Sequence, residues 1–137
     1  MNRLALALTL AFLASAAQAG EAKKEEPGQN VSMAPVALPI VIDGKLVNYV
    51  FVTIRIDLAP LANTTKLREK EPYFRDALVR AAHRTPFTLP GDLTKIDEVR
   101  LKAVMLREAQ AIAGAGAVRG VVVLSQAPKT LRVPAAR

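Results

Sequence analysis

The clearest pattern of apolar and polar positions along this chain is that of two neighbouring β-strands. Two runs rich in β-forming residues, Val36–Ile42 and Leu46–Leu58, flank the dipeptide Asp43-Gly44. Type I′ turns favour this dipeptide because it accommodates positive φ. The pattern therefore predicts a β-hairpin. Pro39 lacks a backbone donor, so the first strand is expected at an edge of the sheet.

The second strand of this hairpin alternates with a period of two residues. Its even-numbered positions are apolar and are expected to face the core; they are Val50, Val52, Ile54 and Ile56. The intervening positions include Arg55 and Asp57, which mark the wetter face of the sheet.

A helical period replaces the strand period further along the chain. Asn63 or Thr64 can cap a helix that begins near Thr65. Pro72 interrupts this pattern, and it fits either a kink in one continuous helix or the first turn of a new one. From there an apolar stripe predicts a buried face, and the helix should end before Pro86. The stripe consists of Phe74, Ala77, Leu78, Ala81 and Ala82.

The next segment, Thr85–Thr94, is rich in proline and predicts a loop, with Phe87 and Leu89 folded back onto the core. A second helix is expected to begin near Asp97 and to end where Gly114 supplies a left-handed position. Its buried stripe is predicted to be Leu101, Val104, Met105, Ala109 and Ile112.

The last apolar run, Val118–Gln126, lacks a clean polar alternation and predicts a central strand. Residues 127–137 are expected to form a C-terminal tail, with room for a short edge strand at Leu131–Val133. Together the elements predict a single α+β domain over residues 36–126. Its small sheet, made of the N-terminal hairpin and the C-terminal strand, packs against two helices.

The N-terminal residues have the order of parts of a secretory signal peptide. Arg3 precedes an apolar run that begins at Leu4, and Ala17-Gln18-Ala19 offers a small-x-small cleavage site. The competing interpretation is a retained membrane anchor. A helix of this length would span roughly 24 Å at ~1.5 Å per residue, against about 30 Å of hydrocarbon. We therefore expect residues 1–19 to be a cleaved signal peptide, residues 20–35 to be a flexible polar linker, and the protein to be periplasmic.

Charge is the feature of composition that bears on partners. The chain has 19 Lys and Arg against 12 Asp and Glu, a formal net charge of +7 at pH 7. In a cytoplasmic protein this surplus would favour nucleic-acid binding, but export and the scarcity of aromatic residues argue against it. We predict no nucleic-acid partner. The surplus is expected to be a solvated surface, with attraction to anionic lipid headgroups or an acidic partner as the second interpretation.

Few residues offer enzymatic chemistry. The chain has one histidine and no cysteine, and the serines beyond residue 19 are Ser32 and Ser125. A hydrolytic triad needs a base held against its nucleophile, and His83 is better explained by packing and by the dipole of its helix. The glycines after residue 113 follow a helix and open a strand, the reverse of a dinucleotide fingerprint. We predict no enzymatic activity and no catalytic, cofactor or metal site.

The order of motifs is similar to that of a known family. The helix start Glu71-Pro72-Tyr73-Phe74-Arg75-Asp76-Ala77-Leu78 has the form x-Pro-x-x-Arg-Asp-Ala, and a final strand runs from Gly116-Ala117-Val118-Arg119-Gly120-Val121 through Gln126. With the N-terminal apolar segment, the polar linker and the strand Tyr49–Leu58, these resemble the flagellar basal-body-associated FliL family over about residues 46–126. The resemblance implies a stomatin-like fold, no enzymatic activity, and a place beside the flagellar motor and its stator units.

One feature departs from that family. Its members keep a membrane-spanning helix after a short cytoplasmic tail, whereas residues 1–19 look cleavable. The leading hypothesis is therefore an exported, non-enzymatic module that supports motility through protein–protein interaction. Its expected partners are flagellar motor or stator components and further copies of itself. Two further possibilities are peripheral contact with the membrane and tethering to it by an uncleaved N-terminal segment.

The surface expected to bind a partner is a cationic helix face, and plain solvation explains its residues equally well. The face consists of Lys66, Arg68, Lys70, Arg75 and Arg80. The alternative hypothesis is an exported small ligand-binding or cell-envelope protein unrelated to flagella, which would hold an apolar ligand between its sheet and helices.

Overall fold

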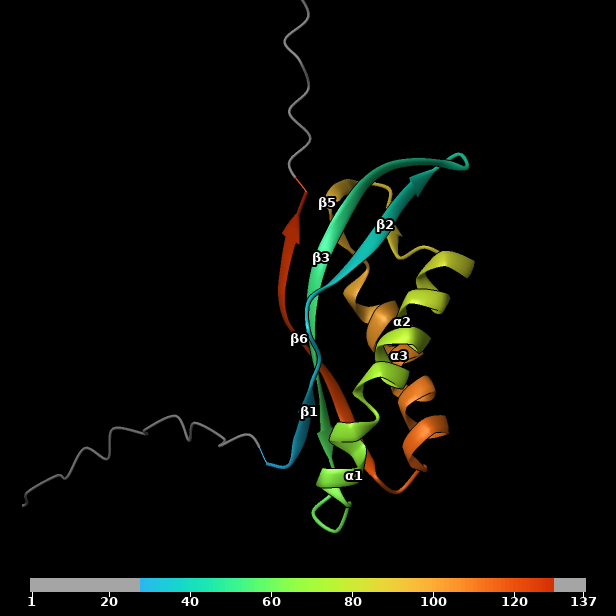
Figure 1. Ribbon diagram of the computed structural model, residues 1–137. Helices are drawn as coiled ribbons and strands as arrows, with labels where there is room; N and C mark the ends of the chain where they lie inside the picture. Colours follow the sequence, from blue (N-terminus) through green and yellow to red (C-terminus); the bar gives the residue numbers. More distant parts are fainter. Residues whose placement is uncertain (1–27, 130–137) are drawn as a thin grey trace, which may run out of the picture.

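The computed structural model describes residues 28–129 and has an α+β architecture, with three helices on one side of an antiparallel sheet (Figure 1). This agrees with the fold class predicted from the sequence. The predicted signal peptide and the edge strand at Leu131–Val133 lie outside the described residues. Within residues 28–129, no helix is long and apolar enough to cross a membrane.

The hairpin forms as predicted, from β2, Val36–Ile42, and β3, Lys45–Leu58. Asp43 and Gly44 have φ values of 50° and 72°, the pair of positive angles that a type I′ turn needs. Pro39 lies in β2, which pairs with β3 along one edge only, so the strand is at a sheet edge as expected.

Strand β3 is the centre of the sheet. Strands β1, Asn30–Ser32, and β2 lie along one of its edges, and β6, Val118–Pro128, lies along the other, all antiparallel. The helices cover the face formed by the even-numbered residues of β3, and all four that were predicted to face the core are 0% exposed. On the opposite face, Arg55 and Asp57 form an ion pair at 2.6 Å.

The prediction that the last strand is central was wrong, because β6 is an edge strand of the described sheet. Its pairing with β3 is irregular at two places, where Leu124 and Arg119 each stand as an extra residue between paired neighbours. Such bulges shift which residues point to each face. Between the bulges the register is regular: Val121 and Val123 pack against the core, and Val122 is paired with Arg55 on the open face. The run shows no alternation because Val122 is apolar although it lies on the open face.

The polar segment 20–35 is not a linker throughout. Residues 30–32 form β1, and Val31 and Met33 are almost fully buried against the core. Leu58 N donates to Gln29 O at 2.8 Å, which ties the start of β1 to the end of β3. The strand itself has one apolar side chain, Val31, and Met33 follows it, which is too little to reveal a period of two in the sequence.

The first helical segment divides into two helices. Helix α1, Thr64–Glu69, is capped by the Asn63 side chain, which accepts from Lys66 N at 3.1 Å. Helix α2, Glu71–Arg84, follows after Lys70, with Pro72 in its first turn. Pro72 therefore opens a new helix. The predicted stripe of α2 is fully confirmed as buried, and the helix ends before Pro86.

The predicted loop after α2 contains a short hairpin of β4, Thr88–Leu89, and β5, Asp92–Ile96. The prediction of an irregular loop was wrong there, because the Thr88 hydroxyl bonds both backbone groups of Val41 at 3.1 Å and so ties the hairpin to β2. Phe87 is buried in the core as predicted.

Helix α3, Glu98–Ala113, begins and ends at the predicted positions. The Asp97 side chain accepts from Arg100 N at 3.1 Å, and Gly114 ends the helix with φ 97°. Leu101, Met105 and Ala109 are buried as predicted. Val104 and Ile112 are only partly buried, because they lie at the border of the helix layer.

Candidate partner-binding groove

The five cations predicted as a partner surface do not form one face. The break at Lys70 separates α1, which carries Lys66 and Arg68, from α2, which carries Arg75 and Arg80. Arg68 Nε donates to Asn30 O at 3.2 Å, and Lys70 Nζ donates to Ile112 O at 3.4 Å.

The two arginines on α2 are each paired with an acid one turn earlier. Arg75 lies 3.4 Å from Glu71, and Arg80 lies 3.0 Å from Asp76. The Arg80–Asp76 pair is exposed, whereas Glu71 is partly buried beside an exposed Arg75. Pairs of this kind on a helix surface contribute only a few tenths of a kcal/mol. Only Lys66 of the predicted five has no side-chain bond or ion pair within the described residues.

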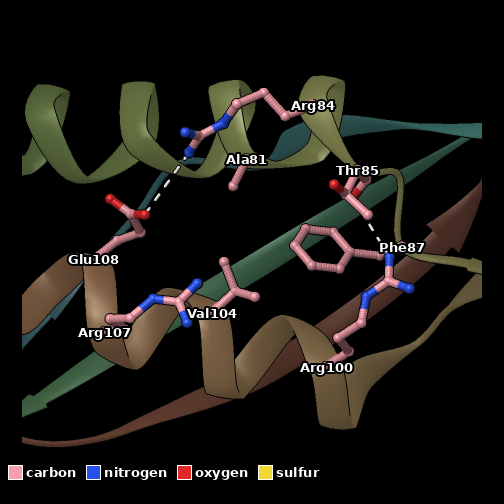
Figure 2. Close-up of a pocket in the computed structure, with 8 residues that line it drawn as sticks. All are labelled: Ala81, Arg84, Thr85, Phe87, Arg100, Val104, Arg107 and Glu108. Carbon is pink, nitrogen blue, oxygen red and sulfur yellow. Dashed lines mark hydrogen bonds and ion pairs between the residues drawn. The ribbon is translucent and has the colours of Figure 1, made fainter.

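A different cationic site lies between α2 and α3, where the two helices run side by side (Figure 2). We call it the α2–α3 groove. Its cavity volume is about 360 Å³. Small Ala81 and partly buried Val104 face each other across it, so the helices leave space at the surface. Its lining residues are Ala81, Arg84, Thr85, Phe87, Arg100, Val104, Arg107 and Glu108.

Arg100 closes one end of the groove. Its Nη2 donates to the carbonyl of Thr85 at 3.4 Å and to that of Pro86, just beyond the last turn of α2. The guanidinium carbon lies 5.2 Å from the centre of the Phe87 ring, within cation–π range. Arg100 Nε is buried and has no hydrogen-bond partner among residues 28–129. These contacts hold a positive charge in a fixed position.

Arg84 and Glu108 bridge the opposite end of the groove, 3.8 Å apart. The Arg84 side chain is 71% exposed, so this ion pair is weak in water. Arg107 projects from α3 beside the groove and has no ion pair within the described part of the chain. The lining of the groove therefore has three guanidinium groups and one carboxylate, which is paired with Arg84 alone.

A second hollow, of about 500 Å³, continues from the groove past Arg84 and Glu108 toward Arg80 and His83. His83 was predicted to be a packing residue, but its side chain is exposed. Its Nδ1 lies 2.8 Å from the carbonyl of Val79, which accepts the hydrogen bond in the last turn of α2.

Residues with catalytic chemistry do not gather in the described part of the chain. Among residues 28–129, no group of three or more His, Cys, Asp or Glu side chains could hold a metal ion. Asp92 serves the β4–β5 hairpin: the Thr94 hydroxyl and amide donate to its carboxylate at 2.6 and 2.9 Å. The hydrogen bond from the hydroxyl has the larger effect in lowering the pKa of this carboxyl, and the bond from the amide lowers it further. Desolvation has a small opposing effect.

The groove residues Arg84, Arg100 and Arg107 were not identified from the sequence, although a signal exists. On α2, positions 77, 80, 81 and 84 share one side of the helix, and on α3, positions 100, 104, 107 and 108 do so. In each set, cations stand beside apolar residues. Recognising the site also requires knowing that these two helix sides meet.

The comparisons with known proteins add no relative. No protein-family model matches the chain, and no curated protein matches it significantly in sequence.

Proposed function

We propose that this protein is an exported, non-enzymatic interaction domain that supports motility by binding a protein of the flagellar basal body or motor. The flagellar assignment rests on the resemblance of residues 46–126 to the FliL family. The α+β architecture of the chain is of the kind that this resemblance implies. The proposed location is the periplasm, with residues 1–19 as the export signal.

The observation that carries an interaction function is the α2–α3 groove. Guanidinium groups bind carboxylates through paired, charge-assisted hydrogen bonds. In the groove, Arg84 and Arg107 flank an apolar floor, and Arg100 is held at one end by two carbonyls. An acidic segment of a partner, with one apolar side chain to cover Val104, would meet both features.

A motility assay tests this proposal. Deletion of the gene is expected to impair swimming in soft agar, and the wild-type gene is expected to restore it. The variant Arg84→Glu/Arg107→Glu should fail to restore swimming although it is exported and folded. Lys45→Glu, a charge reversal at the exposed hairpin turn, is the matched control and should restore it.

The outcomes of this assay separate the two parts of the proposal. Normal swimming of the deletion strain would overturn the flagellar assignment. Full restoration by the double variant would leave that assignment standing and would show that the partner binds elsewhere.

The second candidate function is that of an exported small ligand-binding protein. The volume of the groove lies within the roughly 300–1,000 Å³ of ligand pockets, and its charge would select an anionic ligand rather than an apolar one. Native mass spectrometry of protein purified from its host tests this. A bound mass that disappears in Arg84→Glu/Arg107→Glu would support the second candidate, and ligand-free protein would contradict it.

A further inference from the structure

The turn between β3 and α1 carries an apolar side chain that nothing in the described chain covers. Leu61 is 99% exposed, more than the other large hydrophobic side chains that lie at the surface. A single exposed leucine is common on protein surfaces, so the groups near Leu61 decide whether it is part of a docking surface.

This turn is anchored to the rest of the domain. Ala59 N donates to Ala117 O at 2.9 Å, and Ala62 N donates to Ala59 O at 3.0 Å. The Asn63 cap then fixes the start of α1. Leu61 is therefore presented at the tip of a turn held at both ends.

Cationic side chains follow this tip on α1 and at its end. Lys66 is exposed, and Arg68 and Lys70 are held at the same end of the molecule by bonds to the carbonyls of Asn30 and Ile112. Glu69 and Glu71 are the acids beside them, so three cations stand against two acids at this end of the molecule. An exposed leucine followed along the next helix by lysine and arginine fits the boundary of an anionic bilayer, where apolar groups insert and cations meet headgroups.

The chain also enters the domain at this end. Gln29 O accepts from Leu58 N, so the first described residues lie beside the turn that carries Leu61, and Figure 1 shows both next to α1. Residues 20–27 can span at most about 29 Å when fully extended. Any membrane attachment through residues 1–19 would therefore hold the Leu61 end toward the lipid.

We propose that this end of the domain, with Leu61 at its tip and Lys66, Arg68 and Lys70 around it, docks on an anionic lipid surface. Leu61 enters the headgroup layer, and the cations contact lipid phosphates. The surface is separate from the α2–α3 groove, so the groove stays free for a partner while the domain rests on the membrane.

A site-specific fluorescent probe tests the docking. The chain has no cysteine, so Leu61→Cys can be labelled at a single site with an environment-sensitive dye in the full chain. Val99→Cys is the matched control, because Val99 is 82% exposed and lies at the opposite end of α3 from Gly114. The labelled chains are mixed with vesicles of phosphatidylglycerol and phosphatidylethanolamine, and with phosphatidylcholine vesicles for comparison.

The expected result is a blue shift and stronger emission from position 61 with the anionic vesicles, and little change from position 99. Adding Lys66→Glu to the labelled chain should raise the lipid concentration for half-maximal emission at least about fivefold, the factor that one lysine near an anionic surface contributes. Insertion of residues 1–19 could by itself bring position 61 nearer the lipid than position 99, and the Lys66→Glu chain, which keeps that segment, separates the two cases. An unchanged lipid dependence in that chain would assign the shift to residues 1–19 and overturn the docking.

Other outcomes would overturn the proposal. Equal responses at positions 61 and 99, or no response at 61, would show that the tip does not meet lipid. An equal response to phosphatidylcholine would remove the role of the cations. A shift at position 61 that needs no vesicles and grows with protein concentration would assign Leu61 to contact with a second copy of the chain.

Discussion

The two sides of helix α2 are built from different chemistry. The side toward the sheet is apolar and closed, with Phe74, Leu78 and Ala82 each fully buried. The side toward the α2–α3 groove carries Arg80 and Arg84, which reach into water and pair only weakly with acids. Burial makes the first side intolerant of charge, whereas water screens charge on the second. One helix can thus hold the fold together and present a binding surface, with little coupling between the two.

The largest effect is expected from a charge on the closed side. Leu78→Asp would place an unpaired carboxylate in the core, and the loss should reach at least about 4 kcal/mol, enough to unfold a small domain. Arg80→Ala, two residues away on the open side, should change the free energy of unfolding by less than about 0.5 kcal/mol. Urea denaturation followed by circular dichroism measures both, and a cooperative transition of Leu78→Asp near that of wild type would contradict the comparison.

Strand β3 repeats the same contrast within the sheet. Ile54→Ala removes a fully buried side chain and should cost about 2–5 kcal/mol. Phe51→Ala removes a larger side chain from the opposite face, where Phe51 is 43% exposed. Its cost should be well below that of Ile54→Ala, because much of the ring already meets water. The ratio of the two losses, measured by urea denaturation, checks that only one face of β3 is covered. Equal losses would indicate a cover on the second face.

Some features of the fold could be predicted from the sequence, and others could not. The hairpin turn at Asp43-Gly44, the alternation of β3 and the stripe of α2 follow from local spacing, and they were predicted correctly. The position of β6 was not, because Val122 is apolar although it is paired with Arg55 on the open face, and this removes the alternation that would mark a half-covered strand. Which cations lie together could not be predicted either, because it depends on the break at Lys70 and on the packing of two helices that are distant in the sequence.

Arg100 is partly buried, so its substitution should have an intermediate effect on the free energy of unfolding. Arg100→Gln removes the donation to the Thr85 and Pro86 carbonyls and the contact with Phe87, so we expect a loss of about 1–2 kcal/mol. Arg100→Lys should recover little of it, because the shorter lysine side chain lacks the planar guanidinium group that lies over the Phe87 ring. Thermal unfolding of both variants is the measurement. Full recovery with lysine would show that charge alone matters at this position.

The smallest effect on stability, and the most informative one for the groove, is expected from Arg107→Ala. Arg107 is exposed and has no ion pair within residues 28–129, so its removal should change the free energy of unfolding by less than about 0.5 kcal/mol. If the groove binds an acidic partner, the same substitution removes one of three guanidinium groups and should reduce restored swimming in the deletion strain. Arg119→Ala, on β6 outside the groove, provides an exposed arginine for comparison. A destabilisation above about 1 kcal/mol would mean that Arg107 supports the fold, and normal swimming with Arg107→Ala would remove it from the binding surface.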